Sequence, residues 1–275
     1  MSLSLNTNIS SLQTQQALSQ SQSALQTSLE RLSTGLRVNS AKDDAAAYAV
    51  ASSLTTTLNS QTQGIQNANN AQSYLQTADS YLGQVENNLQ RMRQLAVEAN
   101  NGGLSAADQA NLDKEYQQLA TANKNIATNA NYNGNKLFDG TVASVTFQYG
   151  QNATTDSATI TNVNLSAYGS FTGAGTSVTS AANATAAQTA IDTDLTALKS
   201  ARASLGAQQS GLTSTINTLT SNNTALSAAK SAMIDTDYAA ETSNMTRQNI
   251  LQQAGTAMLA QANSAPNSIL NLLKG

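Results

Sequence analysis

Apolar residues recur at every seventh position along the second half of the chain. The series comprises Ile191, Leu198, Leu205, Leu212, Leu219, Leu226 and Met233, with a partly apolar companion seam at Leu195 and Ile216. Aliphatic residues at heptad spacing are typical of the buried seam of a coiled coil. The run therefore predicts one helix of about 40 residues, which would span about 60 Å at 1.5 Å per residue.

A second pair of heptad seams lies in the first half of the chain. One seam holds Leu75, Leu82, Leu89 and Ala96, and its companion holds Ala78, Val85, Met92 and Ala99. The Asn-Asn-Gly-Gly stretch at 100–103 predicts the end of this helix, because glycine is frequent just past a helix end. Ser105 and Asp108 have the spacing of a capping box and predict that another helix starts there. Its apolar positions would be Leu112, Tyr116, Leu119 and Ile126.

A leucine stripe near the N-terminus is interrupted. Leu25, Leu29, Leu32 and Leu36 follow the same seam spacing, but Gly35 stops the helix. The charged, turn-prone segment 35–44, called the break below, separates this helix from the next. Asp43 and Asp44 would favour the N-terminus of that next helix.

These patterns predict a mainly α fold, an elongated antiparallel coiled coil or helical bundle formed by the N- and C-terminal halves. Strict seven-residue spacing also predicts left-handed supercoiling of neighbouring helices. The alternative, a globular domain of ordinary amphipathic helices, fits less well because such helices rarely keep a heptad register over six repeats.

The middle of the chain lacks the heptad pattern and contains turn and strand signals instead. The Asn-Gly of residues 131–136 is a turn signal. Val145, Phe147 and Tyr149 alternate with polar residues, which predicts a strand. Ile160, Val163 and Leu165 could supply its partner strand and complete a small β-hairpin. Residues 167–189 are mostly Gly, Ser, Thr and Ala without periodicity, and they predict an exposed, variable loop at the far tip.

Composition agrees with long helices and narrows the function. The chain of 275 residues has 3 Phe, 8 Tyr and no Trp, few aromatics for a globular core. Its net charge of −3 and 13 scattered basic residues argue against a nucleic-acid surface. With no Cys and no His there is no thiolate zinc site and no histidine base, so we expect no cofactor, no metal and no enzyme activity. Asp192 with Asp194 and Asp235 with Asp237 resemble metal-binding pairs. Residues two apart on a helix point in different directions, so helix starts or solvated surface explain them better.

Both ends of the chain lack charge. Residues 1–29 and 248–273 contain no charged side chain, although each segment carries aliphatic residues. Disordered tails are the alternative, but disorder favours high net charge and few aliphatics, so we expect these ends to be buried. The start lacks the basic and apolar regions of a secretory signal. No window is apolar enough over about 18 residues to span a membrane, so no membrane insertion is expected.

Several of these stretches together resemble the bacterial flagellins. In the first half they are Leu-Asn-Thr-Asn-Ile-Ser-Ser-Leu at the start, Ser-Thr-Gly-Leu-Arg-Val-Asn-Ser-Ala-Lys-Asp-Asp-Ala-Ala around the break, Leu-Gln-Arg-Met-Arg-Gln-Leu-Ala-Val at 89–97 and Tyr-Asn-Gly-Asn-Lys-Leu-Phe at 132–138. The end, from Gln248 to Leu273, is also similar. The resemblance covers nearly the whole chain, and the short middle implies little or no outer variable domain.

The resemblance implies an extracellular structural subunit that polymerises with itself into the flagellar filament for swimming motility. It further implies export without a cleaved signal peptide, through the flagellum's own type III apparatus, with an export chaperone and the filament cap as partners. By the same resemblance, residues 1–40 and 235–275 would form the inner tube, 41–140 and 190–234 a helical outer rod, and 141–189 the hairpin and loop tip. The expected assembly interface comprises Leu5, Ile9, Leu12, Leu25, Leu29, Leu32, Leu36, Leu251, Met258, Leu259, Leu270 and Leu273.

The break would be the spoke between inner tube and outer rod. The charges in the break and just before it, Arg31, Arg37, Lys42, Asp43 and Asp44, are candidates either for pairing between subunits or for a solvated helix junction. Because isolated helices are marginal in water, the terminal helices are expected to be mobile in the monomer and to become helical in the filament.

The family is also recognised by a vertebrate innate receptor, a Toll-like receptor. The matching positions are Arg91, Leu95 and Glu115, which could equally serve filament contacts. A hook–filament junction protein with flagellin-like ends is the alternative function. It would not polymerise into long fibres when seeded with filament fragments.

Overall fold

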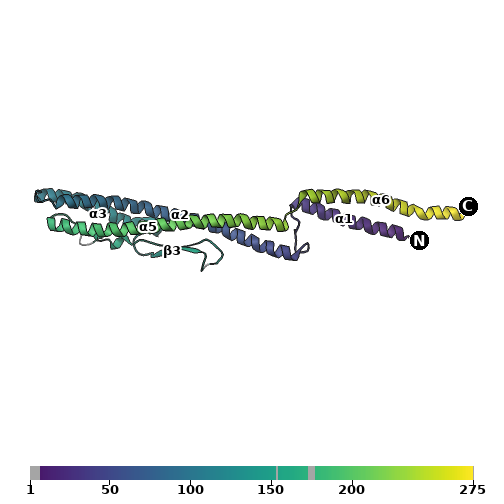
Figure 1. The fold of residues 1–275 in the computed structure, drawn as a ribbon, viewed down its shortest axis with the longest axis horizontal. Coiled ribbons are helices and arrows are strands. Elements are labelled where there is room, and N and C mark those ends of the chain that lie inside the picture. The colour runs from purple at the N-terminus through teal and green to yellow at the C-terminus, as the bar shows by residue number, and fades with distance from the viewer. Residues whose placement is uncertain (1–6, 153, 173–176, 275) are drawn as a thin grey trace. The chain divides into compact units, whose positions relative to one another are not determined.

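The computed structural model describes residues 7–152, 154–172 and 177–274, and the side chains of 172 and 265–274 lie outside this description. The chain divides into two compact units (Figure 1). The first, here the terminal unit, comprises Met1–Thr56 and Ala225–Gly275. The second, the central unit, comprises Thr57–Thr224. The mainly helical fold with two small strand pairs confirms the predicted fold class.

In the terminal unit, helices α1 (Ile9–Thr34) and α6 (Tyr238–Lys274) lie side by side. Asn8 caps the start of α1 by accepting the Ser11 N–H, and Asp237 caps α6 by accepting the Ala239 and Ala240 N–H groups. Gly35 ends α1 in the left-handed conformation, at φ +72°, as the sequence predicts. The unit also contains the first turns of α2 (Ala45–Ala99) and the last turns of α5 (Ala181–Ile234).

The central unit is built from α2, α5 and α3 (Ala106–Asn129). The predicted heptad seams form its core: Leu75, Leu82, Leu89, Ile191 and Leu198 are fully buried. The α5 series continues with buried Leu205 and Leu212, then becomes half-buried at Leu219, Leu226 and Met233. The predicted helix end at 100–103 and the Ser105–Asp108 capping box are both present. Handedness of the supercoil stays a prediction.

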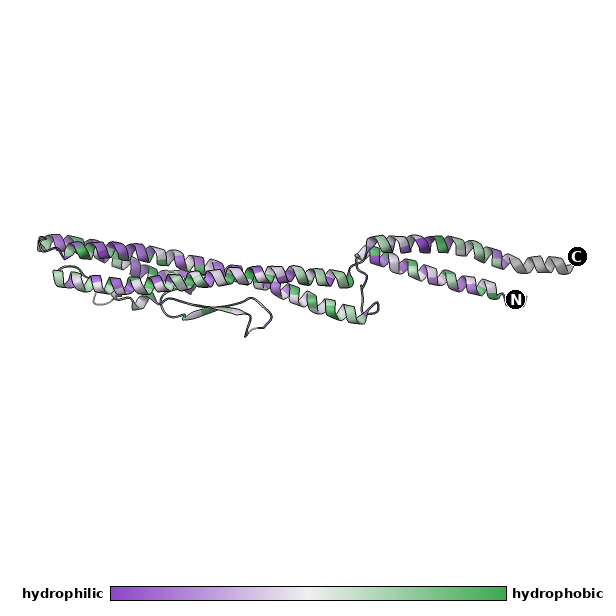
Figure 2. Ribbon diagram, in the orientation of Figure 1, coloured by the Kyte–Doolittle hydropathy of each residue, from purple (hydrophilic) through white to green (hydrophobic). Residues whose placement is uncertain are grey.

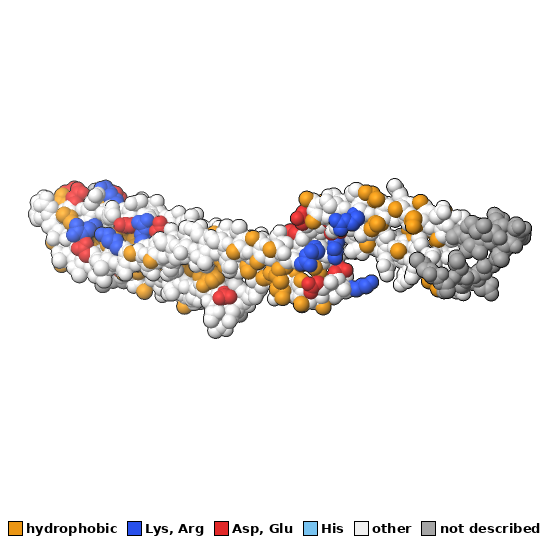
Figure 3. All heavy atoms as spheres, turned by 45° about the vertical axis from the view of Figure 1, so that its right-hand side comes forward, with side chains coloured by type: hydrophobic (Ala, Val, Ile, Leu, Met, Phe, Trp, Pro, Cys, Tyr) orange, Lys and Arg blue, Asp and Glu red, His pale blue; other side chains and the backbone are white. Residues whose placement is uncertain are grey.

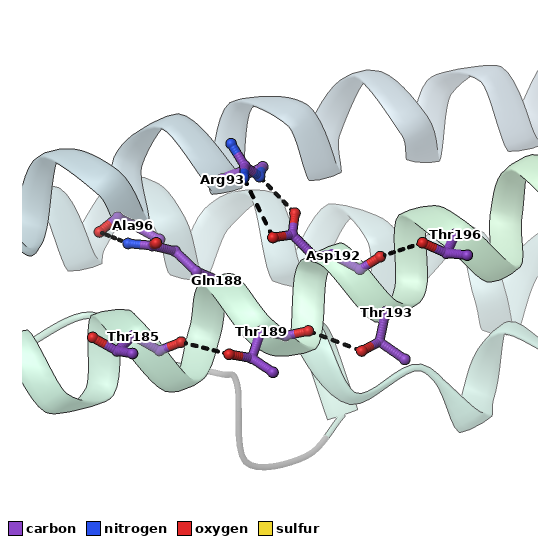
Figure 4. Close-up of polar contacts among 8 residues, drawn as sticks. All are labelled: Arg93, Ala96, Thr185, Gln188, Thr189, Asp192, Thr193 and Thr196. Atoms are coloured by element: carbon purple, nitrogen blue, oxygen red, sulfur yellow. Dashed lines mark hydrogen bonds and ion pairs between the residues drawn. The ribbon is translucent and has the colours of Figure 1, made fainter.

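Exposed ion pairs and hydrogen bonds join α5 to α2 across this core (Figure 4). Arg93 Nε and Nη2 lie 2.6 and 3.3 Å from the two carboxylate oxygens of Asp192. Gln188 Nε2 donates to the Ala96 carbonyl at 3.0 Å. Farther along, Arg202 pairs with both Asp79 and Glu86, which holds the helices in register on one side.

A threonine ladder runs along the exposed side of α5 (Figure 4). Thr185, Thr189, Thr193 and Thr196 each donate their hydroxyl to the carbonyl four residues earlier, at 2.8 to 3.1 Å. Their donors are therefore satisfied within the helix rather than by water.

The predicted Asn-Gly turn and the predicted β-hairpin are both present. Strands β1 (Asn131–Tyr132) and β2 (Asn135–Lys136) are joined by Asn133 and Gly134, both at positive φ, as an Asn-Gly hairpin turn requires. Strands β3 (Ser144–Gln148) and β4 (Ser157–Thr161) pair antiparallel, with Val145 opposite Ile160. Val163 and Leu165 lie beyond β4 rather than in it.

The β3–β4 hairpin is docked on α2. Asn67 Nδ2 donates to the Gln148 carbonyl at 2.8 Å, and the Tyr74 ring packs on Phe147 with centroids 5.7 Å apart. The backbone of Tyr149 approaches so closely that a Cβ built on Gly64 would lie 2.0 Å from its carbonyl oxygen. Only glycine permits that contact.

The predicted exposed loop at 167–189 is wrong for the described residues. The segment contains a 3-10 turn (Leu165–Ala167), the short helix α4 (Gly169–Thr172) and, from Ala181, the first turns of α5. Residues from this region are buried in the central core: Leu165, Tyr168, Phe171, Val178, Ala184 and Ala187. A few anchors among small residues hold the segment against α3 and α5, which periodicity could not reveal.

Asp194 also departs from the prediction of helix start or solvated surface. It is buried and accepts the backbone N–H groups of Gly169 and Ser170, the latter at 2.8 Å, so it caps α4 from α5. Burial, and to a smaller extent the Asp194 charge, raises the pKa of Tyr168 to about 12. Asp192 is the exposed partner of Arg93, whose hydrogen bond lowers the pKa of the Asp192 carboxyl.

Candidate functional site

The faces that α1 and α6 turn toward each other are unusually polar. The buried residues of α1 are Ser11, Ser21 and Ser28. Ser11 Oγ donates to Asn263 Oδ1 at 2.7 Å, and Ser21 Oγ lies 3.0 and 3.1 Å from the side-chain and backbone oxygens of Gln248. The two helices run antiparallel, and side-chain hydrogen bonds join them at three levels along their contact.

Among the described residues of this pair, Glu241 is the buried residue that carries a charge. Its residue is 8% exposed. Ser28 Oγ donates to one carboxylate oxygen at 2.5 Å, and Arg31 Nη1 lies 3.7 Å from the other. A buried carboxylate is tolerated when a hydrogen bond and a cation compensate for its lost hydration.

Several large apolar side chains lie on the outside of the pair. Figure 2 shows hydrophobic positions interspersed with hydrophilic ones along both helices, and Figure 3 shows hydrophobic side chains on the surface of α6. We call the following residues the outer apolar face: Ile9, Leu12 and Leu29 of α1, and Ile250, Leu251 and Met258 of α6. They are between 50% and 62% exposed. A self-sufficient coiled coil would place its leucines against the partner helix, whereas here half-buried Leu25 and Leu32 share the seam with serines and other large apolar side chains stay exposed.

The predicted interface residues divide into three groups. Ile9, Leu12, Leu29, Leu251 and Met258 are exposed on the outer apolar face. Leu25, Leu32, Leu36 and Leu259 are half-buried. Leu5 and the side chains of Leu270 and Leu273 lie outside the described residues. The sequence analysis did not identify Ile250, which is 60% exposed. It also did not identify Ser21 and Ser28, although their seven-residue spacing could have indicated that they share a helix face.

The break is ordered by backbone contacts to the start of the C-terminal segment. Leu36 and Asp235 form an isolated antiparallel bridge, and the Thr236 N–H donates to the Gly35 carbonyl at 2.9 Å. Val38 is buried with Ile234 in a small apolar cluster. Figure 3 shows charged side chains gathered around this point.

Most of the proposed spoke charges have partners within the chain. Arg31 pairs with Glu241, and Arg37 donates to the Met233 carbonyl. Asp44 accepts the Ala47 N–H and caps α2. Asp43 accepts the N–H groups of Asn39 and Ser40, and the hydrogen bonds from Ser40 lower the pKa of its carboxyl. Among the described residues, the Lys42 side chain makes no hydrogen bond or ion pair. Asp43 and Asp44 thus hold the turn and the start of α2 within the chain, and pairing of these charges between subunits stays a prediction.

The predicted receptor residues do not all share one surface. Arg91 on α2 and Glu115 on α3 form an exposed ion pair, with Nε 2.7 Å from Oε1. The Glu115 hydrogen bond raises the pKa of the Arg91 guanidinium. Leu95 is fully buried in the central core, so its side chain can act only by supporting the helix that carries Arg91.

The described part of the chain holds no group of three or more carboxylates placed to bind a metal ion. The same residues include no helix that is long and apolar enough to cross a membrane.

Comparison with known proteins covers both ends of the chain. Residues 5–143 match the model of the bacterial flagellin N-terminal helical region, and residues 188–273 match that of the C-terminal helical region. The chain is similar to the flagellin of Halalkalibacterium halodurans, with 38% identity over 98% of this chain and 99% of that protein. It is 35% identical to the flagellin of Bacillus subtilis, again over 98% and 99%.

A solved structure is similar as well. The crystal structure of Bacillus cereus flagellin has 34% identity and a TM-score of 0.50, and the match covers 60% of this chain and 93% of that chain.

Proposed function

This chain belongs to the bacterial flagellin family, whose members are the structural subunits of the extracellular flagellar filament, and from that premise we propose that the α1–α6 pair carries the contact between subunits. The observation that carries the proposal is the outer apolar face around a polar seam. A helix pair that leaves several large apolar side chains exposed to water is stabilised by neighbours that cover them.

The energetic argument is direct. Fully burying a Leu, Ile or Met side chain contributes about 1.5–3 kcal/mol. Leu12, Ile250 and Met258 each leave more than half of their surface exposed, so much of that contribution is still available to association. Ordering the helices opposes it by about 1–2 kcal/mol per backbone residue fixed. Folding of the ends and assembly are therefore coupled, and the ends of the free monomer are expected to be mobile.

Seeded polymerisation tests this assignment. Met258→Ser is expected to abolish pelleting after sheared filament fragments are added, because it removes an exposed apolar contact. Gln253→Ser, at an exposed polar position on the same helix, is the matched control and should pellet like the unmodified chain. Circular dichroism should be unchanged in both. Normal pelleting of Met258→Ser would refute the proposed interface.

In the filament we place residues 1–40 and 235–275 in the inner tube, 41–140 and 190–234 in the outer rod, and the 141–189 segment on the rod. The break is then the spoke. Because Arg31, Asp43 and Asp44 already have partners in the chain, Lys42 is the spoke charge best placed for a contact to a neighbour.

Export is proposed to use the flagellar type III apparatus, with an export chaperone and a filament cap as partners. The absence of cysteine fits passage as an unfolded chain, since no disulfide can form on the way. In cells lacking the export ATPase of that apparatus, the protein should be missing from the culture fluid. Its appearance there in normal amount would contradict this route.

We further propose that the free monomer is bound by the vertebrate innate flagellin receptor through Arg91 and Glu115. In a receptor reporter assay Arg91→Ala should lose potency. Arg93→Ala is the matched control, because Arg93 lies on the same helix and also holds one exposed carboxylate. Equal potency of the two variants would contradict the assignment.

A further inference from the structure

We propose that Glu241, held by Ser28 and Arg31, sets the axial register of α1 against α6 and so the relative axial positions of the apolar side chains that the pair presents to neighbouring copies. This inference rests on the proposed assembly role of the α1–α6 pair.

The rest of the seam specifies register weakly. Its other contacts recur at heptad spacing: Ser21 lies opposite Gln248, the Leu18 side chain packs over Gly255, and Leu18, Leu25 and Leu32 are seven residues apart. Ser21 and Ser28 are seven residues apart, as are Glu241 and Gln248. A serine can donate to either partner, so a slide by one heptad, about 10 Å along the helix, would cost these serines little.

Glu241 does not tolerate such a slide. In one direction it would lie opposite Ser21, and the position that Arg31 now takes would be filled by Ala24. In the other direction it would lie opposite Gly35, past the end of α1. Either way a buried carboxylate would lose its cation, and an unpaired buried charge is strongly unfavourable. A single buried polar residue can fix helix register in the same way in coiled coils.

The position of this cluster suits that role. Glu241 is in the first turn of α6, and the Leu36–Asp235 bridge lies just before it. The bridge aligns the backbone at the break, and the Ser28–Glu241–Arg31 cluster carries that alignment into the helices. A pair formed from this end would fix the axial positions of Leu12 and Met258 relative to each other.

Cysteine pairs can measure the register, because the chain has no other cysteine. The in-register pair is Leu18→Cys with Gly255→Cys, since the Leu18 Cδ1 lies 3.3 Å from a Cβ built at 255. The off-register pair is Leu18→Cys with Ala262→Cys, one heptad farther along α6. Each double variant is oxidised mildly after polymerisation on seeds, and the intrachain disulfide yield is measured by mass spectrometry.

With Glu241 intact, the in-register disulfide should dominate. In Glu241→Leu the ratio of in-register to off-register yield should fall about tenfold, as expected when the residue that fixes register is lost. Glu30→Gln is the matched control. The Glu30 carboxylate is exposed and immediately precedes Arg31 in α1, so this substitution should leave the ratio unchanged. An unchanged ratio in Glu241→Leu would overturn the proposal.

Two further results keep the test decisive. If Glu241→Leu does not assemble, Arg31→Gln is measured instead, and an unchanged ratio there overturns the proposal. If the pairs with intact Glu241 crosslink in register in solution but do not pellet with seeds, the proposed assembly role fails while the register inference is supported.

Discussion

Replacing Gly64 by alanine should destabilise the central unit, against the usual trend for a helix. In a helix interior alanine is normally favoured over glycine by about 1 kcal/mol. Here the new Cβ would lie 2.0 Å from the Tyr149 carbonyl oxygen and 2.6 Å from its carbon. Both are backbone atoms, so the β3–β4 hairpin would have to move by more than about 1 Å to reach ordinary contact.

That movement weakens the contacts between the β3–β4 hairpin and α2. The Asn67 hydrogen bond to the Gln148 carbonyl lengthens, and the Tyr74–Phe147 ring contact opens. Overpacking of this kind costs about 1–3 kcal/mol. After the helix-propensity gain is subtracted, the expected net loss is about 1–2 kcal/mol.

Urea unfolding followed by circular dichroism measures the difference. Gly206→Ala on α5 is the control, because a Cβ there meets no atom within 4 Å and the helix gain should be fully realised. The reasoning requires opposite signs for the two substitutions. If Gly64→Ala stabilised the protein as Gly206→Ala does, the close approach of Tyr149 would be refuted.

Three further outcomes are expected. Asp194→Ala should lower the free energy of unfolding by about 1–3 kcal/mol, because buried N–H groups lose their acceptor, whereas the exposed Asp192→Ala should cost at most about 1 kcal/mol in the same urea titration. Burial and the Asp194 charge raise the Tyr168 pKa to about 12, so its folded state holds the proton more tightly than the unfolded state. Stability should accordingly be complete below about pH 10 and decline as pH rises toward 12, and Tyr168→Phe should flatten that decline. Removal of residues 1–30 and 246–275 should leave the helical signal of the central unit intact and abolish seeded pelleting; full-length fibres from that chain would contradict the assembly role.

The heptad pattern predicted the central helices well because burial there follows the seven-residue period. Leu82 and Leu198 are fully buried, and Gly35 ends α1 as expected from its freedom at positive φ. The Asn-Gly turn was equally readable, since its two residues require positive φ.

Other features depend on contacts that a linear pattern does not encode. The 167–189 segment looked featureless because small residues separate its buried anchors, Tyr168, Phe171 and Val178. Asp194 resembled surface because the N–H groups it caps lie more than twenty residues away in sequence.

The α1–α6 pair shows the same limit on the candidate site. Leucine spacing suggested an apolar seam, but Leu29 faces outward while the neighbouring Ser28 faces Glu241. Which of two adjacent stripes is covered depends on the partner helix, and no local preference decides it.

The threonine ladder of α5 has a consequence for hydration. Each hydroxyl already donates its proton to a carbonyl of its own helix. Covering this side of α5 with another surface therefore leaves no threonine donor without an acceptor. The threonine side chains themselves offer methyl groups and hydroxyl oxygens outward, and none of them carries a charge to be screened. The strength of a contact made through these threonines would therefore depend little on salt concentration.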